Sequence, residues 1–268
     1  MSLRYARIKN HPRTFSRLFG LSVDQFDTIK DKVEPLFKAK VIDVYERPGR
    51  PFKLTVPDLI LMVLLYYRSY VSQVFVGYLF GLDDSRVCRL IQKLEPLLCK
   101  VMALPDKKSL SKEDIEELLI DATEQPVERP QRGQKAYYSG KKKRHTLKTE
   151  VRTTLHGRII HTSRACPGSV HDDTLHKQGP SLSKKSRVYV DSGYQGLDKH
   201  HKKTELPYKM SKNHKLDHDE KEYNRALSRI RVKIEHVLGD IKIFKIMADR
   251  YRHKLKRYDI KFQIILVL

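Results

Sequence analysis

The sequence predicts a protein with both helices and strands, of the α+β or mixed α/β class. An all-helical N-terminal domain is followed by a domain built on a mixed sheet. Two observations predict this class. Residues 1 to about 105 repeat apolar side chains at helical spacing, whereas short apolar runs and alternating segments appear from about residue 118. The segment 103–112 is polar and contains a proline, which is typical of a linker. We therefore expect two domains, at 1–105 and 106–268.

The chain is strongly basic. Its 268 residues include 54 Lys and Arg against 32 Asp and Glu, a formal charge of +22. Clustered positive charge of this size indicates a polyanionic partner, although a solubilising surface excess is the alternative. The three cysteines contain no Cys-x-x-Cys pair, and the longest apolar run, 59–67, is too short to span a bilayer. We expect no membrane partner and a cytoplasmic, DNA-associated protein, in the nucleoid of a prokaryote or the nucleus of a eukaryote.

The first helices are predicted from their capping residues. Ser22 and Gln25 form a capping-box pattern that opens a helix through about Phe37. The stretch 45–53 is rich in proline, glycine and arginine and predicts a turn. Thr55 follows as the expected N-cap of a second, largely buried helix.

A helix-turn-helix layout is predicted next. A short helix over 72–80 is followed by a turn at 81–85 and by an amphipathic helix over 86–101. The outer face of the last helix is basic, and we expect Arg86, Arg89 and Lys93 to contact DNA. An ordinary helical hairpin with a solvated face explains this pattern equally well.

The second half alternates between short strands and helices. The apolar runs 118–121 and 188–191 each end in an aspartate, and two alternating segments flank His156 and Gly157 as a hairpin. The remaining expected elements are a helical turn opened by Ser111 and Asp114, a long helix over 223–248 and an apolar terminal segment over 259–268. Two interpretations of the terminal segment stay open: exposed apolar surface, or a helix packed on the sheet.

Three carboxylates carry the candidate chemistry. Asp121 and Asp191 each end a predicted strand, where side chains point toward a crevice at the sheet edge. Glu235 lies in the long helix next to apolar residues, where a carboxylate is costly unless it is paired or binds a metal. Each has a structural alternative, in a turn, a cap or a helical ion pair, but together they favour a catalytic site.

The helix around Glu235 adds two cations. Arg231, Glu235 and Lys242 follow spacings of four and seven and therefore share one stripe. Arg231 and Lys242 are suited to holding DNA phosphates on either side of the carboxylate. Hard carboxylate oxygens beside phosphate favour Mg²⁺ or Mn²⁺, and two ions per site are expected, with Asp121, Asp191 and Glu235 as ligands.

Four motifs, in order, resemble transposases of the DDE superfamily, in the insertion-sequence-five group that is similar to Harbinger transposases. They are 118–124 (LLIDATE), 167–172 (PGSVHD), 190–196 (VDSGYQG) and 231–235 (RVKIE), and the resemblance covers about residues 50–268. It implies a ribonuclease H-like catalytic domain with Asp121, Asp191 and Glu235 as its triad. The family's helix signature, Tyr-x₂-Arg-x₃-Glu-x₆-Lys, has a serine here at its first position, Ser228.

The resemblance implies an insertion-sequence transposase, a divalent-metal-dependent polynucleotidyl transferase and endonuclease. Water would attack a phosphodiester at the element's end, and the freed 3′-hydroxyl would attack target DNA. The expected partner is double-stranded DNA, both terminal repeats and target, bound by a homodimer. Two alternatives stay open: a nuclease or domesticated transposase that cuts without joining, and a DNA-binding regulator whose carboxylates are inactive.

A second basic segment, 129–144, interleaves cations with tyrosines, which suits phosphate contact and base stacking. A solvated loop is its alternative. Asp172 and Asp173 follow a family motif and either approach the active site or cap a helix. The cations expected to contact DNA in the basic segment are Lys141, Lys142, Lys143 and Arg144.

Overall fold

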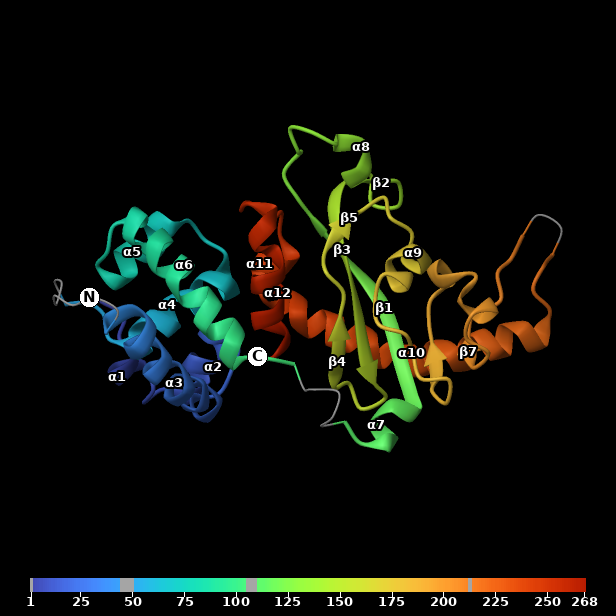
Figure 1. Ribbon diagram of the computed structural model, residues 1–268, viewed down its shortest axis with the longest axis horizontal. Coiled ribbons are helices and arrows are strands. Elements are labelled where there is room, and N and C mark those ends of the chain that lie inside the picture. The colour runs from blue at the N-terminus through green and yellow to red at the C-terminus, as the bar shows by residue number, and fades with distance from the viewer. Residues whose placement is uncertain (1, 44–50, 105–109, 212–213) are drawn as a thin grey trace. The chain divides into compact units, whose positions relative to one another are not determined.

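The computed structural model describes residues 2–43, 51–104, 110–211 and 214–268 (Figure 1). The chain forms two compact units. The helical unit collects residues 1–103, 241–249 and 253–268, and the sheet unit collects 104–240 and 250–252. Among the described residues, no helix is both long and apolar enough to cross a membrane. Much of the predicted turn at 45–53 and of the predicted linker at 103–112 lies outside the described residues.

The helical unit begins with short amphipathic helices and ends with two helices from the C-terminus. Its elements are α1 (Tyr5–Ile8), α2 (Pro12–Phe19), α3 (Val23–Phe37), the π-helical η1 (Lys38–Ile42), α4 (Val56–Ser69), α5 (Gln73–Phe80), α6 (Asp84–Val101), α11 (Lys245–Ala248), η5 (Leu255–Arg257) and α12 (Tyr258–Leu266).

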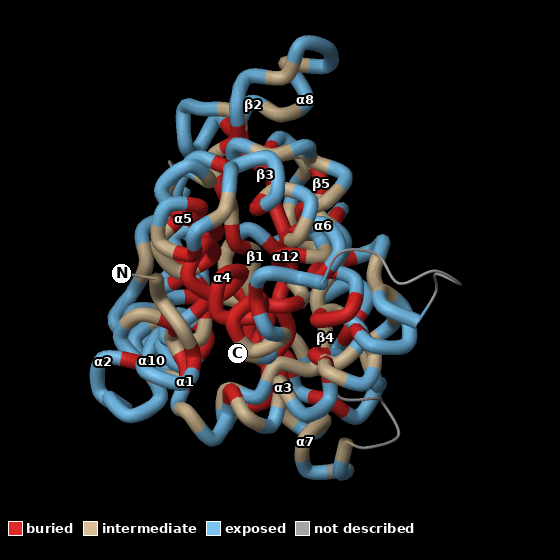
Figure 2. The backbone as a smooth tube through the Cα atoms, turned by 90° about the vertical axis from the view of Figure 1, so that its left-hand side faces the viewer, coloured by how far each residue is buried: buried red, intermediate tan, exposed pale blue. Residues whose placement is uncertain are grey.

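Helix α4 forms the centre of the helical unit. All ten residues from Asp58 to Tyr67 are buried, as the red tube of α4 in Figure 2 shows. Thr55 caps it by accepting a hydrogen bond from the Asp58 amide, and the capping box of Ser22 and Gln25 opens α3, so both predicted starts are confirmed. A helix hydrophobic on all sides is stable only when neighbouring helices surround it.

The apolar C-terminal segment is a helix of this unit. Helix α12 packs against α6, and Lys261 and Arg257 both pair with the fully buried Glu95 of α6. Tyr67 of α4 donates a further hydrogen bond to Glu95. The interpretation in which this segment packs on the sheet is therefore wrong. The reason is that its apolar face and its two cations match α6 together, whereas sequence periodicity reports only the apolar face.

The sheet unit combines a long antiparallel strand pair, β1 with β3, with short parallel strands. Its elements are α7 (Lys112–Glu116), β1 (Glu117–Pro126), α8 (Gln134–Tyr137), β2 (Tyr138–Ser139), β3 (Arg144–Thr154), β4 (Ile159–Thr162), β5 (Cys166–Pro167), α9 (Asp172–Lys177), β6 (Arg187–Tyr189), the 3₁₀ turns η3 (Ser192–Tyr194) and η4 (Leu197–Lys199), β7 (Thr204–Glu205) and α10 (His218–Ile243). The last three residues of α10 belong to the helical unit.

The sheet is mixed. Strand β1 pairs antiparallel with β3 on one side and parallel with β6 on the other, and β6 pairs parallel with β7. Strand β3 also pairs antiparallel with β2, β4 and β5. The helical N-terminal region and the mixed sheet confirm the predicted fold class.

Several predicted boundaries change in the structure. Strand β1 continues five residues beyond Asp121, because β3 pairs with it along its whole length. Strand β6 ends at Tyr189, two residues before Asp191. The long helix predicted over 223–248 begins at His218 and stops at Ile243, before the extended residue Phe244 opens α11.

Candidate active site

The register of two parallel strands brings the predicted aspartates together. Residues 117, 118 and 119 of β1 lie opposite residues 187, 188 and 189 of β6, a constant offset of 70. Continued by two residues, this offset places Asp121 beside Asp191. The Oδ1 atoms of Asp121 and Asp191 accept hydrogen bonds from the amides of Ala122 and Ser192, at 2.7 and 2.6 Å. These bonds leave the Oδ2 atoms available for a cation.

Arg231 of α10 bridges the two aspartates. Its Nη2 lies 3.6 Å from Oδ2 of Asp121, and its Nη1 lies 3.6 Å from Oδ1 of Asp191. The Arg231 side chain is largely buried, and its Nε has no hydrogen-bond partner among the described residues. One guanidinium therefore balances two carboxylates and keeps a buried donor unused.

Burial sets the protonation of this site. It raises the pKa of Asp121 from 3.8 to about 6, and the negative charges of Asp191 and Asp172 act in the same direction. The charge of Arg231 and the hydrogen bond from Ala122 oppose the rise without cancelling it. A carboxylate with a raised pKa gains most from a neighbouring cation, because the cation offsets the solvation that it has lost.

Glu235 does not join the two aspartates in this structure. It is exposed, so the expectation that its apolar neighbours make its carboxylate costly is wrong. Ile234 takes the buried position instead, and about 100° of helical rotation per residue turns its neighbour toward solvent. Among the described residues, no three His, Cys, Asp or Glu side chains are close enough together to hold a metal ion.

A buried lysine organises the opposite face of the sheet. Nζ of Lys148 lies 2.8 Å from Oδ1 of Asp172 and 3.7 Å from Oε1 of Glu124, and it donates a hydrogen bond to the Val170 carbonyl. Asp172 is the first residue of α9 and packs against Gly193, where a Cβ would lie 2.1 Å from its Oδ2. A side chain at residue 193 would displace the Asp172 carboxylate, and α9 contacts the turn that follows Asp191.

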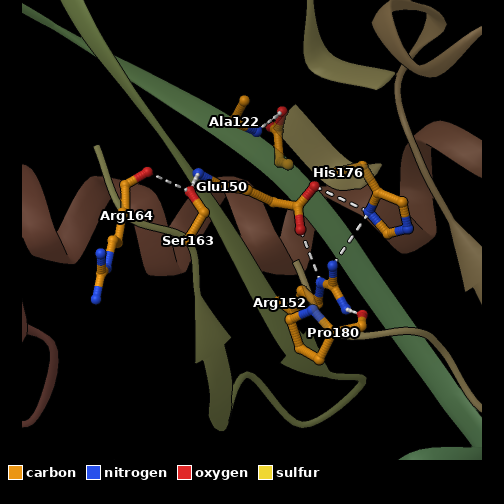
Figure 3. A network of polar contacts seen from close by, with 8 residues as sticks. Ala122, Glu150, Arg152, Ser163, Arg164, His176 and Pro180 are labelled. Atoms are coloured by element: carbon orange, nitrogen blue, oxygen red, sulfur yellow. Dashed lines mark hydrogen bonds and ion pairs between the residues drawn. The ribbon is translucent and has the colours of Figure 1, made fainter. Parts of the chain in front are cut away.

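A second buried network links β3 to α9 (Figure 3). Glu150 is fully buried, and its two carboxylate oxygens lie 2.7 Å from Nε of Arg152 and 3.0 Å from Nδ1 of His176. Arg152 also donates to the Pro180 carbonyl. Burial by itself raises the pKa of Glu150, but the His176 hydrogen bond and the Arg152 charge outweigh it, so this pKa is lowered. The network fastens α9 to β3.

Sequence reasoning missed these two clusters, although their signal is present. Lys148, Glu150 and Arg152 alternate along β3, and alternating strand residues point to one face. Three charged residues of mixed sign on one strand face indicate an ionic cluster when the strand is buried. The capping interpretation of Asp172 is also incomplete, because His171 is the N-cap of α9 and the Asp172 carboxylate pairs with Lys148.

The cations expected to contact DNA fall into two groups. Arg231 is largely buried against the aspartates. The others are exposed, on α6, in the turn before and at the start of β3, and in the last turn of α10: Arg86, Arg89, Lys93, Lys141, Lys142, Lys143, Arg144 and Lys242. Helices α5 and α6 are joined by the tight turn predicted for a helix-turn-helix, with Gly81 left-handed and Asp83 as the N-cap of α6.

Comparison with known families identifies this arrangement. Residues 120–268, which hold Asp121, Asp191 and Glu235, match the family of DDE superfamily endonucleases. The chain belongs to this superfamily. Residues 52–103, which span α4 to α6, match the helix-turn-helix of DDE superfamily endonucleases, so the helix-turn-helix interpretation is confirmed over the helical-hairpin alternative.

Two relatives cover nearly the whole chain. It is 39% identical over 265 residues to a probable transposase for insertion sequence element IS702 of Microchaete diplosiphon, covering 94% of this chain and 92% of the relative. It is 24% identical over 243 residues to a putative transposase for insertion sequence element IS112 of Streptomyces albus G, covering 90% and 88%. No solved structure matches the chain. Family and relatives together support a nuclease or transposase enzyme.

Proposed function

We propose that this chain is the transposase of an insertion sequence, which binds the element's ends and catalyses metal-dependent phosphodiester hydrolysis and strand transfer. The observation that carries the proposal is the pair of Asp121, in β1, and Asp191, two residues beyond the end of the adjacent strand β6, both paired with Arg231 of α10. The 39% identity to an insertion-sequence transposase over nearly the whole chain supports it. We propose a ribonuclease H-like catalytic domain over 106–268 and a DNA-binding domain over 1–105, in the insertion-sequence-five group. Residues 241–249 and 253–268 of the proposed catalytic domain fold as part of the helical unit.

The two aspartates suit a divalent metal. They offer hard oxygen ligands, and their ion pairs with Arg231 show that the pair accommodates positive charge. We propose Asp121, Asp191 and Glu235 as the ligands of two Mg²⁺ or Mn²⁺ ions, with Glu235 turning inward from its exposed position. When bound, such ions activate an attacking oxygen and stabilise a leaving one.

The chain's own residues supply the positioning. A water oxygen attacks the phosphorus at the element's end, and the 3′-oxygen leaves as a hydroxyl. This hydroxyl then attacks a phosphodiester of the target and displaces the target's own 3′-oxygen, which leaves as a hydroxyl. Neither step needs a covalent intermediate with the protein. Arg231, once freed from the aspartates, donates to a phosphate oxygen, and Lys242 contacts the backbone farther along. The exposed cations of α6, and those just before and at the start of β3, bind the backbones of terminal-repeat and target DNA. A homodimer brings two ends together.

A DNA-binding regulator is the second candidate. The observation that favours it is the exposed Glu235, which leaves two carboxylates and an arginine where a triad is expected. A nuclease that cuts without joining uses the same residues. Cleavage of a plasmid carrying the element's ends, with and without Mg²⁺ or Mn²⁺, separates the enzyme from the regulator, and analysis of joined products separates transposase from nuclease.

A further inference from the structure

A cavity adjoins the candidate active site and shares Asp191 and Arg231 with it. It measures about 430 Å³, within the range of about 300–1,000 Å³ typical of small-ligand pockets. Asp191 and Arg231 form its wall toward the candidate active site. The lining residues that matter here come from the segment after β7 and from α10: Tyr208, Lys209, Met210, Asn224 and Ser228.

The segment after β7 presents apolar side chains to this cavity while leaving them open to solvent. Tyr208 is 51% exposed and Met210 is 68% exposed, and Lys209 between them adds a cation. Large exposed apolar side chains beside a catalytic site are typical of a surface that a ligand covers. An aromatic face, a thioether and a cation together match a nucleobase attached to a phosphate.

The Tyr208 ring is held in place before any ligand binds. Asn224 of α10 accepts a hydrogen bond from the Tyr208 amide at 2.9 Å and donates one to its carbonyl at 3.0 Å. The ring packs edge-on against Tyr223, with 5.2 Å between centroids, and the Tyr223 hydroxyl donates to Glu205. A ring fixed in this way loses little conformational entropy when a base stacks on it.

Ser228 leaves the space free. It lies one turn before Arg231 on α10, lines the cavity and is exposed. A bulky side chain at this position would project toward the volume that Tyr208 borders. The aromatic group of the cavity therefore comes from the segment after β7, and the helix contributes small and polar groups.

We propose that this cavity binds the nucleotide next to the scissile phosphate, with its base stacked on Tyr208. The proposal rests on the proposed function, because the phosphate between Asp191 and Arg231 is what brings a nucleotide to the cavity. A phosphodiester held there extends its neighbouring nucleoside one residue along the strand, toward Tyr208. Stacking tolerates every base, since each has a π-face, so the site orients the strand with little sequence preference.

The test measures binding without cleavage. The probe is a fluorescent duplex carrying the terminal repeat that borders the gene, in EDTA, with an abasic site placed at each terminal position in turn. We expect the wild-type chain to lose about tenfold in affinity at one or two adjacent positions, a loss in the range of base–aromatic stacking. Tyr208→Leu should bind the intact duplex about tenfold more weakly, and an abasic site at those positions should not lower its affinity further. Tyr208→Phe keeps the ring and should behave as wild type.

Two results overturn the proposal: unchanged affinity of Tyr208→Leu for the intact duplex, or weaker binding that keeps the full response to the abasic site. Cleavage by the wild-type chain, measured separately with Mg²⁺, distinguishes the two claims. If the enzyme is active but the effect of the abasic site does not depend on Tyr208, only the nucleotide site is ruled out. If that dependence is found but the protein does not cleave DNA, only the proposed function is ruled out. A protein that does not bind the duplex rules out both.

Discussion

The ionised form of Asp121 is costly in the folded chain, so replacing this residue by asparagine should stabilise the protein at neutral pH. The pKa of Asp121 rises from 3.8 to about 6 on folding, chiefly through burial. At about 1.4 kcal/mol per pH unit, this difference corresponds to about 3 kcal/mol once the group is ionised in both states. Asparagine still accepts the hydrogen bond from Ala122 and carries no charge, and Arg231 keeps Asp191 as a partner.

The sign follows from proton binding. Between about pH 4 and pH 6, folded Asp121 binds more protons than unfolded Asp121, so wild-type stability falls as the pH rises through this window. Asp121→Asn lacks this dependence. The variant should match the wild type near pH 4, gain through the window, and be up to about 3 kcal/mol more stable above pH 6.

The assay is urea unfolding in EDTA, followed by circular dichroism at half-unit steps from pH 4 to pH 8. Circular dichroism suits a chain without tryptophan. A stability difference that does not change with pH would refute the reasoning, because it would mean that burial leaves the Asp121 pKa unperturbed. A wild type that gains on the variant with rising pH would reverse the sign and refute it more strongly.

Three further predictions test other parts of the molecule. Arg89→Ala should weaken binding of the element's end about tenfold relative to unrelated DNA, because Arg89 is exposed on α6; equal losses on both DNAs, in a gel-shift titration, would remove it from sequence reading. DNA affinity should fall steeply between about 50 and 200 mM salt, and a flat response would contradict the polyanion argument. Glu150→Gln should cost about 3–5 kcal/mol in urea unfolding, because the buried Arg152 loses the carboxylate that balances its charge. Glu128→Gln, from an exposed pair with Arg250, should cost less than about 1 kcal/mol, and equal losses would contradict the role of the buried network.

Local signals predicted helix starts well. Ser22, Thr55 and Ser111 all cap helices as their sequence patterns indicate, because each cap needs only a side chain and an amide three residues away. The turn between α5 and α6 was predictable for the same reason. Gly81 takes the left-handed conformation that ends α5, and Asp83 starts α6.

The carboxylate site was predictable in residue identity and less so in geometry. Asp121 lies inside β1 because β3 extends the strand, and that pairing is between residues far apart in the sequence. The bridge from Arg231 to both aspartates joins three separate elements, and no local spacing contains it. Leu227 and Ile234 of α10 are buried, whereas Glu235, next to Ile234, faces outward, and no local pattern in the sequence indicated that orientation.

The most direct test of the central claim is DNA cleavage by the purified chain, with Mg²⁺, with Mn²⁺ and with EDTA. The substrate is a plasmid carrying the element's ends, and Asp191→Asn and Glu235→Gln are measured beside the wild type, with DNA binding as the control for folding. We expect cleavage that requires either metal and disappears in both variants while binding persists. Metal-dependent cleavage retained by Glu235→Gln would remove Glu235 from the triad. Tight binding by the wild type without cleavage under either metal would contradict the enzyme and favour the regulator.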